Sequence, residues 1–270
     1  MQIIDVRTRA RVATLIERVL IVDARAPYCQ SLGERLRDVG PCQIWTAADP
    51  GGALDLAAQI DPRVVFVGHS AGLDPARFIR ALRRSDLGCR RAPVILVSSI
   101  ATAAAIVAAR DAGAHEFLRR PFTVEDLARH LDAVAGRPRG WVEGVDYVGP
   151  DRRRFNTGDY SEALRRRVEH TTSSDNARMV QALRILEAAM LAIEADPHQA
   201  VRAMRAQADE IAAVAKAHAD HGLWAAATKL GHELASLNGP LDRARAASLI
   251  GPLLTKLGAS TPADQRRSAA

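Results

Sequence analysis

Several residue types and patterns are scarce in this chain, and each absence narrows what the protein can be. Only three of the 270 residues are cysteine, widely spaced and without a Cys-x-x-Cys pair, so neither a disulfide framework nor a structural zinc site is expected. No apolar run approaches the roughly 20 residues of a membrane-spanning helix, and the charged N-terminal segment does not resemble a signal peptide. Walker, zinc and hydrolase motifs are absent. We therefore expect a cytoplasmic protein with no membrane insertion, cofactor, metal or enzymatic activity.

Lysine is also scarce. The chain has three lysines, so arginine supplies nearly all of its positive charge. A formal net charge of +6 and a pI near 9.8 permit an anionic partner without requiring one. The hydrophobic and charged fractions, 48% and 25%, are those of a globular protein, and 270 residues suffice for two domains.

Residues 18–135 alternate between short apolar runs and longer amphipathic segments. Runs with the length and composition of strands lie at 18–23, 42–47, 63–68, 93–98 and 115–119. Helical patterns lie at about 27–39, 50–60, 74–86, 101–112 and 123–135. Strands that alternate with helices of this length indicate βαβ units. We predict an α/β domain with a five-stranded, doubly wound parallel sheet, preceded by an N-terminal extension at 1–17.

The rest of the chain has a different pattern. Residues 136–174 are rich in Gly, Pro and Arg and have no helical or strand periodicity, which predicts a linker. Residues 175–258 contain only helical segments, and predict an all-α helical bundle. The polar segment 259–270 is predicted to be disordered. Two apolar stripes are expected in the core of the bundle: Met179, Leu183, Leu186, Met190 and Ile193 in its first helix, and Trp224, Leu230, Leu234 and Leu237 in its third.

The α/β segment contains "VLIVDARAP", "PRVVFVG", "APVILVSS" and "ARDAGAHEFLRRPF", followed by "TVEDLARHL". With these motifs it resembles the receiver domain of bacterial response regulators, the CheY-like superfamily, which has a flavodoxin-like fold. The resemblance covers residues 18–135, nearly half of the chain. The last two motifs are the most specific, because the family ends with Asp-Ala-Gly-Ala, a short strand, Lys-Pro-Phe and a helix.

The resemblance implies a site at the carboxyl ends of the strands. In the family, two acids after the first strand bind Mg²⁺, an Asp ending the third strand accepts a phosphoryl group, and a Ser or Thr and a Lys hold the phosphoryl oxygens. The matching positions here are Asp23, Ala24, Gly68, Ser98 and Arg120. Only the first acid and the hydroxyl are kept, so the resemblance implies a degenerate phosphorylation pocket. We expect Asp23 to pair with Arg120, because a guanidinium suits bidentate carboxylate pairing.

The chemistry of these residues supports the same conclusion independently of the family. Phosphoryl transfer to a carboxylate needs a nucleophilic oxygen and a Mg²⁺ ion held by oxygen ligands. One carboxylate beside an arginine is a poor Mg²⁺ site, and glycine offers no nucleophile. His69 and Ser70 are alternative acceptors, although His69 would face another direction if the strand continues.

The segment after the α/β domain carries two triple-arginine clusters. Its "YVGPDRRRF" resembles the "YxGPDRRR" tail of many alphaproteobacterial receivers, whereas the later "YSEALRRR" lacks Gly-Pro. The resemblance implies binding of cyclic di-GMP, since guanidiniums pair with phosphates and stack on guanine. The candidate residues are Tyr147, Asp151, Arg152, Arg153, Arg154, Tyr160, Arg165, Arg166 and Arg167. The alternative is a solvated basic linker, or one that docks on an acidic partner.

Three functions follow from these features. The first is a phosphorylation-independent response regulator (a pseudo-receiver) that contacts signalling proteins: a kinase, a phosphotransfer protein or another regulator. The second is a cyclic di-GMP effector. The third is histidine phosphotransfer by His232 in the bundle, although the Lys-Gly that follows the phosphorylated His in such domains is missing. A homodimer is left open. Nucleic acid is not an expected partner, because no helix-turn-helix pattern is present.

Overall fold

The computed structural model describes residues 6–70, 72–136, 139–152, 155, 171–237 and 241–260. They form two compact units. The first comprises the described residues up to 142 together with those of 147–155, and the second comprises 143–146 and the described residues from 171 onward.

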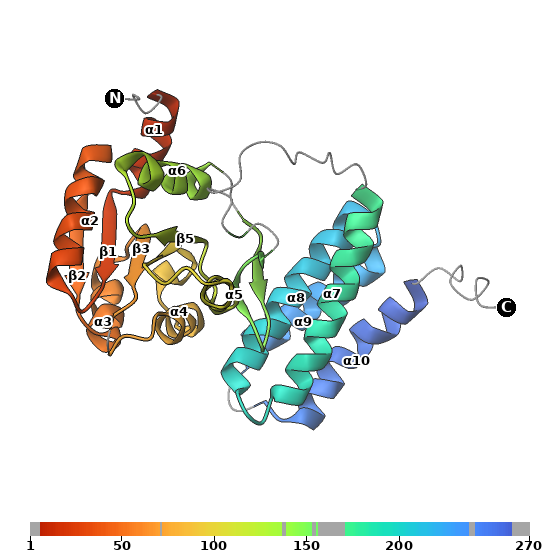
Figure 1. Cartoon of the computed structure of the whole chain (residues 1–270). Coiled ribbons are helices and arrows are strands. Elements are labelled where there is room, and N and C mark those ends of the chain that lie inside the picture. Colours follow the sequence, from red (N-terminus) through yellow and green to blue (C-terminus); the bar gives the residue numbers. More distant parts are fainter. Residues whose placement is uncertain are drawn as a thin grey trace. The chain divides into compact units, whose positions relative to one another are not determined.

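The first unit is built on a parallel five-stranded sheet (Figure 1). Its strands are β1 (Arg18–Val22), β2 (Gln43–Ala47), β3 (Val64–Gly68), β4 (Val94–Ser98) and β5 (Glu116–Arg119). The strand order is β2-β1-β3-β4-β5, which is the order of flavodoxin-like receivers. The predicted fold class is confirmed. The order reverses between β1 and β3, so the loops that follow these two strands border the crevice where such folds place their sites.

Helices follow the strands at nearly the predicted positions: α2 (Ala26–Val39), α3 (Pro50–Ile60), α4 (Pro75–Arg84), α5 (Ala103–Ala112) and α6 (Val124–Ala135). Local chemistry explains where they begin. Asp49 and Asp74 are the N-cap residues of α3 and α4. Their carboxylates accept backbone N–H groups of the first turn, and a proline follows each of them. Thr123 and Asp126 form a capping box at the start of α6.

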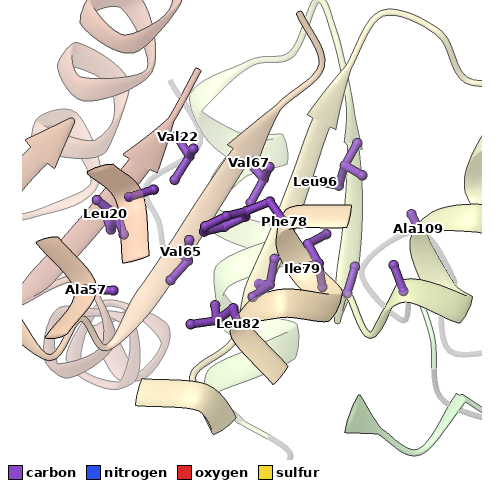
Figure 2. Packing of buried hydrophobic residues seen from close by; sticks show 14 of the residues in the cluster. Leu20, Val22, Ala57, Val65, Val67, Phe78, Ile79, Leu82, Leu96 and Ala109 are labelled. Atoms are coloured by element: carbon purple, nitrogen blue, oxygen red, sulfur yellow. The ribbon is translucent and has the colours of Figure 1, made fainter. Parts of the chain in front are cut away.

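The core lies on both faces of the sheet because successive strand residues point to opposite sides. On one face, Val65 and Val67 of β3 pack with Phe78, Ile79 and Leu82 of α4 (Figure 2). On the other face, residues of β1, β3 and β4 pack with α2 and α6: Val19, Ile21, Val64, Phe66, Ile95, Val97, Leu32, Leu36, Leu127 and Leu131. Strands covered on both faces are uniformly apolar, as observed for β3.

The first unit extends beyond its predicted boundaries. Helix α1 (Val6–Leu15) lies in the segment predicted as an extension, but Val12 and Ile16 are fully buried in the core and Arg11 pairs with Asp132 of α6 at 2.7 Å. Strands β6 (Trp141–Glu143) and β7 (Val148–Pro150) form a two-stranded sheet inside the predicted linker. The prediction that 136–174 contains no strand is therefore wrong. Three-residue strands are too short to show an alternating pattern.

Glycine is needed where β7 approaches α5. Gly113 ends α5 with φ of 101°, in the left-handed region that glycine adopts readily. A β-carbon at this position would lie 2.9 Å from the carbonyl oxygen of Val148. Gly113, the glycine of the Asp-Ala-Gly-Ala motif, thus allows α5 to end in a left-handed conformation and allows β7 to pack closely against it.

A fully buried arginine ties several loops of this unit together. Arg83 is 0% exposed. Its Nε and Nη2 donate to the Gly113 carbonyl at 3.0 and 2.9 Å, and its Nη1 donates to the carbonyls of Arg90 and Ala92 at 2.6 and 2.8 Å. Nη2 also lies 3.2 Å from His115 Nδ1. Burial lowers the Arg83 pKa to about 9, which leaves the guanidinium charged at neutral pH.

The second unit is helical, as predicted, with α7 (Thr171–Ala192), α8 (Pro197–Ala217), α9 (His221–Ala235) and α10 (Arg243–Ser260). Asp196 and Asp220 cap α8 and α9. Helix α10 continues to Ser260, past the predicted start of the tail, and the remaining tail lies outside the described residues. Within the described parts of the chain, no helix is long and apolar enough to cross a membrane.

The predicted core of the helical unit is correct in part. In α7, Leu186 is buried, and Met179, Leu183 and Met190 are half-buried; Ile193, directly after the helix, is buried. In α9, Leu230 and Leu234 are buried and Leu237 beyond it is half-buried, but Trp224 is 43% exposed, contrary to the prediction. The buried face of α9 runs through Leu223, Ala227, Leu230 and Leu234. Trp224 follows Leu223 and is therefore rotated about 100° away from that face.

Candidate functional site

The carboxyl ends of β1, β3, β4 and β5 bring together the predicted pocket residues. Asp23 follows β1, Gly68 ends β3, Ser98 ends β4, and Arg120 follows β5. The backbone N–H of Arg120 donates to the Ser98 carbonyl at 2.9 Å. These ends meet because parallel strands in register place their carboxyl termini along one edge of the sheet.

The carboxylate of Asp23 lies at the centre of the pocket. It is 3% exposed, and its Oδ2 accepts a hydrogen bond from Nη2 of Arg120 at 3.1 Å. Its Oδ1 accepts from the backbone N–H of Arg25 at 3.0 Å and from Arg25 Nε at 3.4 Å. The predicted pairing of Asp23 with Arg120 is confirmed. A nearly buried carboxylate needs such partners, since an isolated buried charge is strongly unfavourable.

Gly68 leaves the space that the Asp23 carboxylate fills. A β-carbon built on Gly68 would lie 1.9 Å from Oδ2 and 2.4 Å from Cγ of Asp23. Both distances are far below van der Waals contact, so no side chain fits at position 68 while Asp23 keeps this conformation. Asp23 can therefore adopt this conformation only because residue 68 has no side chain.

Two residues that the sequence reasoning did not include, Arg25 and Tyr28, border the pocket. The guanidinium carbons of Arg25 and Arg120 lie 3.9 and 4.2 Å from the centroid of the Tyr28 ring. Nη2 of Arg25 also donates to the His69 carbonyl at 2.6 Å, which links the loop after β1 to the loop after β3. Their position directly after Asp23, at the turn from β1 into α2, is a signal that could have identified them.

His69 and Ser70 lie beside the pocket. His69 is exposed, and its Nδ1 is 3.4 Å from the Ser98 hydroxyl oxygen, which also accepts the Ile100 N–H at 3.0 Å. The Ser70 hydroxyl oxygen accepts the Ala24 N–H at 3.4 Å. Each side chain therefore has a local hydrogen-bonding role in the loops.

The residues of the pocket do not fit Mg²⁺. The ion takes six oxygen ligands in near-octahedral geometry, including carboxylates. Asp23 is the one carboxylate among the five pocket residues, and two guanidiniums already contact it. No group of three or more His, Cys, Asp or Glu residues within the described ranges has a geometry that could hold a metal ion.

The described residues of the arginine-rich tail are part of the fold. Tyr147 is 9% exposed, its hydroxyl donates to the Pro150 carbonyl at 2.6 Å, and the Arg152 guanidinium lies 4.5 Å from its ring centroid. Arg152 also pairs with Asp111 of α5 at 3.1 Å. The Asp151 N–H donates to the Gly140 carbonyl at 2.8 Å. Tyr147 is therefore not free to stack on a nucleotide base, contrary to the prediction.

The remaining candidates for nucleotide binding lie outside the described residues: Arg153, Arg154, Tyr160, Arg165, Arg166 and Arg167. Binding of cyclic di-GMP by this segment stays a prediction. His232, the candidate phospho-carrier, lies exposed on α9, two residues before the buried Leu234. Phosphotransfer by His232 also stays a prediction.

The sheet order and the strand-end pocket define the first unit as a doubly wound, flavodoxin-like α/β domain. The chain is 29% identical over 132 residues to the transcriptional regulatory protein PdtaR of Mycobacterium tuberculosis, a match that covers 47% of this chain and 60% of that protein. Among solved structures, the chemotaxis protein CheY4 of Vibrio cholerae is 24% identical, with a TM-score of 0.41 over 44% of this chain and 98% of its own. A receiver domain from Clostridium thermocellum is 20% identical, with a TM-score of 0.39 and the same 44% of this chain covered, against 94% of its own. No protein-family model matches the chain.

Proposed function

We propose that this protein is a response regulator whose receiver domain acts without phosphorylation and without catalytic activity, through contacts with other signalling proteins. The observation that carries the proposal is the position of the Asp23 carboxylate, 1.9 Å from where a β-carbon of residue 68 would lie. The similarity to PdtaR, which is named a transcriptional regulatory protein, supports a regulatory role. The match spans 60% of that protein's length.

The chemistry of the pocket disfavours a phosphorylated aspartate. A carboxylate attacks phosphorus with an oxygen lone pair, and the reaction needs Mg²⁺ to neutralise the phosphoryl oxygens. Both oxygens of Asp23 accept hydrogen bonds from arginines, which holds their lone pairs in charge-assisted bonds. Asp23 therefore has a structural role in this pocket.

The same contacts favour one fixed arrangement of the loops. Arg120 joins the end of β5 to the end of β1, and Arg25 joins the loop after β1 to the loop after β3. In this arrangement an ion pair and a hydrogen bond connect the loops, and no phosphoryl group is needed to connect them. A domain of this kind presents a constant surface to a kinase, a phosphotransfer protein or another regulator.

The proposal is tested with a small-molecule phosphodonor. The full chain is incubated with acetyl phosphate and Mg²⁺, and its intact mass is measured. We expect no phosphoryl adduct and no change in the amide NMR spectrum of the wild type. The control is the variant Ala24→Asp, Gly68→Asp, Arg120→Lys, which restores the receiver pattern and is expected to become phosphorylated. A phosphoryl adduct on the wild type, at His69 or at any other residue, would overturn the proposal.

A further inference from the structure

Arginines gather on α4 and on the short helix η1 (Gly88–Arg91) of the first unit. Residues 77–91 contain six arginines and one acidic residue, Asp86. Arg83 is buried, as described above. The other five define what we call the α4–η1 surface: Arg77, Arg80, Arg84, Arg90 and Arg91.

The packing of α4 turns Arg77 and Arg80 outward. Phe78, Ile79 and Leu82 point from α4 onto the sheet (Figure 2). Arg77, Arg80 and Arg84 follow a spacing of three and four residues, which places them on one face of a helix. Arg77 and Arg80 are exposed and Arg84 is half-buried. The three guanidiniums therefore form a row along the outer face of α4.

Counter-ions distinguish Arg77, Arg80 and Arg91 from other exposed arginines of the same unit. Arg11 pairs with Asp132 at 2.7 Å, Arg63 with Glu17 at 3.0 Å, and Arg152 with Asp111 at 3.1 Å. Among the residues that the structure describes, no carboxylate pairs with Arg77, Arg80 or Arg91. Their charges are available to an external anion.

Trp141 of β6 supports one end of the surface. The guanidinium carbons of Arg90 and Arg91 lie 5.5 and 5.3 Å from its ring centroid, and that of the buried Arg83 lies at 5.4 Å. Such contacts stabilise a cation at an aromatic face without neutralising its charge. Trp141 thus restrains Arg91 while leaving its N–H groups able to donate.

We propose that the α4–η1 surface binds the phosphate backbone of a nucleic acid without reading its bases. Guanidiniums match phosphate oxygens in a bidentate geometry, and contacts of this kind supply nearly all of the free energy of sequence-independent binding. A protein partner fits less well, because protein interfaces centre on a desolvated core of apolar and aromatic anchors. Neither α4 nor η1 has an exposed large hydrophobic residue within its described length. The chain lacks a helix-turn-helix pattern, but such a motif serves to read bases. Binding to the phosphate backbone does not require it.

The test uses fluorescence anisotropy with two labelled DNA duplexes of about 20 base pairs and unrelated sequence. We expect the full chain to bind both with equal affinity, with a Kd of roughly 10⁻⁴ to 10⁻⁶ M at physiological salt. In Arg77→Ala, Arg80→Ala, Arg91→Ala, the slope of log Kd against log salt is expected to fall by about 3, because each lost phosphate contact contributes about 0.9. Affinity at low salt is expected to fall at least about tenfold.

The matched control removes the same number of charges elsewhere. Arg205, Arg243 and Arg245 are exposed on α8 and α10, and their replacement by Ala is expected to leave the slope unchanged. An unchanged slope in the α4–η1 variant, or an equal loss in the control, would overturn the proposal. Displacement of the duplex by polyglutamate at equal charge concentration would also overturn it, since the surface would then recognise an acidic polypeptide. Failure here leaves the phosphodonor test unaffected, because the two concern different surfaces.

Discussion

The Oδ2 atom of Asp23 lies 1.9 Å from the position that a β-carbon would occupy on Gly68. The glycine at position 68 and the position of the Asp23 carboxylate therefore depend on each other. The Asp23 carboxylate lies against Gly68, where Arg120 and Arg25 hold it. A side chain at position 68 therefore requires Asp23 to move.

This relationship predicts a large cost for the smallest substitution at position 68. Gly68→Ala is expected to lower the free energy of unfolding by about 1–3 kcal/mol, because the new methyl group overlaps the Asp23 carboxylate. In an Asp23→Ala background the same substitution should cost less than half as much, since the two closest atoms are gone. Urea unfolding of the four proteins in this cycle measures the coupling. Additive effects would show that Asp23 moves away without cost.

Arg83 is expected to be important for stability. Arg83→Met leaves the buried carbonyls of Gly113, Arg90 and Ala92 without their donor, and should cost about 3–5 kcal/mol in urea unfolding. Arg83→Lys keeps the charge but cannot reach all three carbonyls, so its cost should be intermediate. The control Arg80→Met alters an exposed residue of the same helix and should change stability by less than about 0.5 kcal/mol. Equal effects at positions 80 and 83 would contradict the assigned role.

His115 should make stability depend on pH. Its Nδ1 accepts the Val94 N–H at 3.2 Å and faces Arg83 Nη2 at 3.2 Å, so the folded ring is neutral. Burial, followed by the charges of Arg83 and Arg139, holds the His115 pKa well below 6.5. The unfolded chain binds a proton near pH 6.5 and the folded chain does not, so stability should fall as the pH drops below about 6.5.

The variant His115→Asn isolates this effect, because an amide oxygen can accept the same hydrogen bonds and does not titrate in this range. Its unfolding free energy, measured between about pH 8 and pH 5, should fall less steeply than that of the wild type. The difference should approach about 1.4 kcal/mol per pH unit below 6.5. Parallel curves for the two proteins would contradict the prediction.

Tyr147 should titrate at unusually high pH. Burial raises its pKa from 10 to about 12, although the charges of Arg83 and Arg152 oppose the shift. Since the folded pKa is raised, the stabilisation from the neutral phenol is present below about pH 10 and is lost as the pH rises through 12. The wild type should show a phenolate absorbance step near pH 12, and Tyr147→Phe should remove it. A step that persists in this variant would assign the high pKa to another tyrosine.

The sequence predicted the strands, the helices between them and the site residues at the strand ends closely. These features depend on local signals: apolar runs such as Val64 to Val67, N-cap residues such as Asp74, and the turn after each strand. The pairing of Asp23 with Arg120 was also predictable, because parallel strands bring their carboxyl ends together and opposite charges in a buried site must pair.

Other features depend on which side chains meet in three dimensions. The predicted linker gave no sign of β6 and β7, since their position depends on the close approach of Gly113 to Val148. The spacing of Trp224 fits an apolar stripe on α9. The helix is nevertheless rotated about its axis so that Leu223 is buried and Trp224 is exposed. The chain by itself determined a doubly wound fold with a glycine at the end of its third strand. Only the tertiary structure decided that the Asp23 carboxylate fills the space this glycine leaves, because that depends on side-chain direction across two strands.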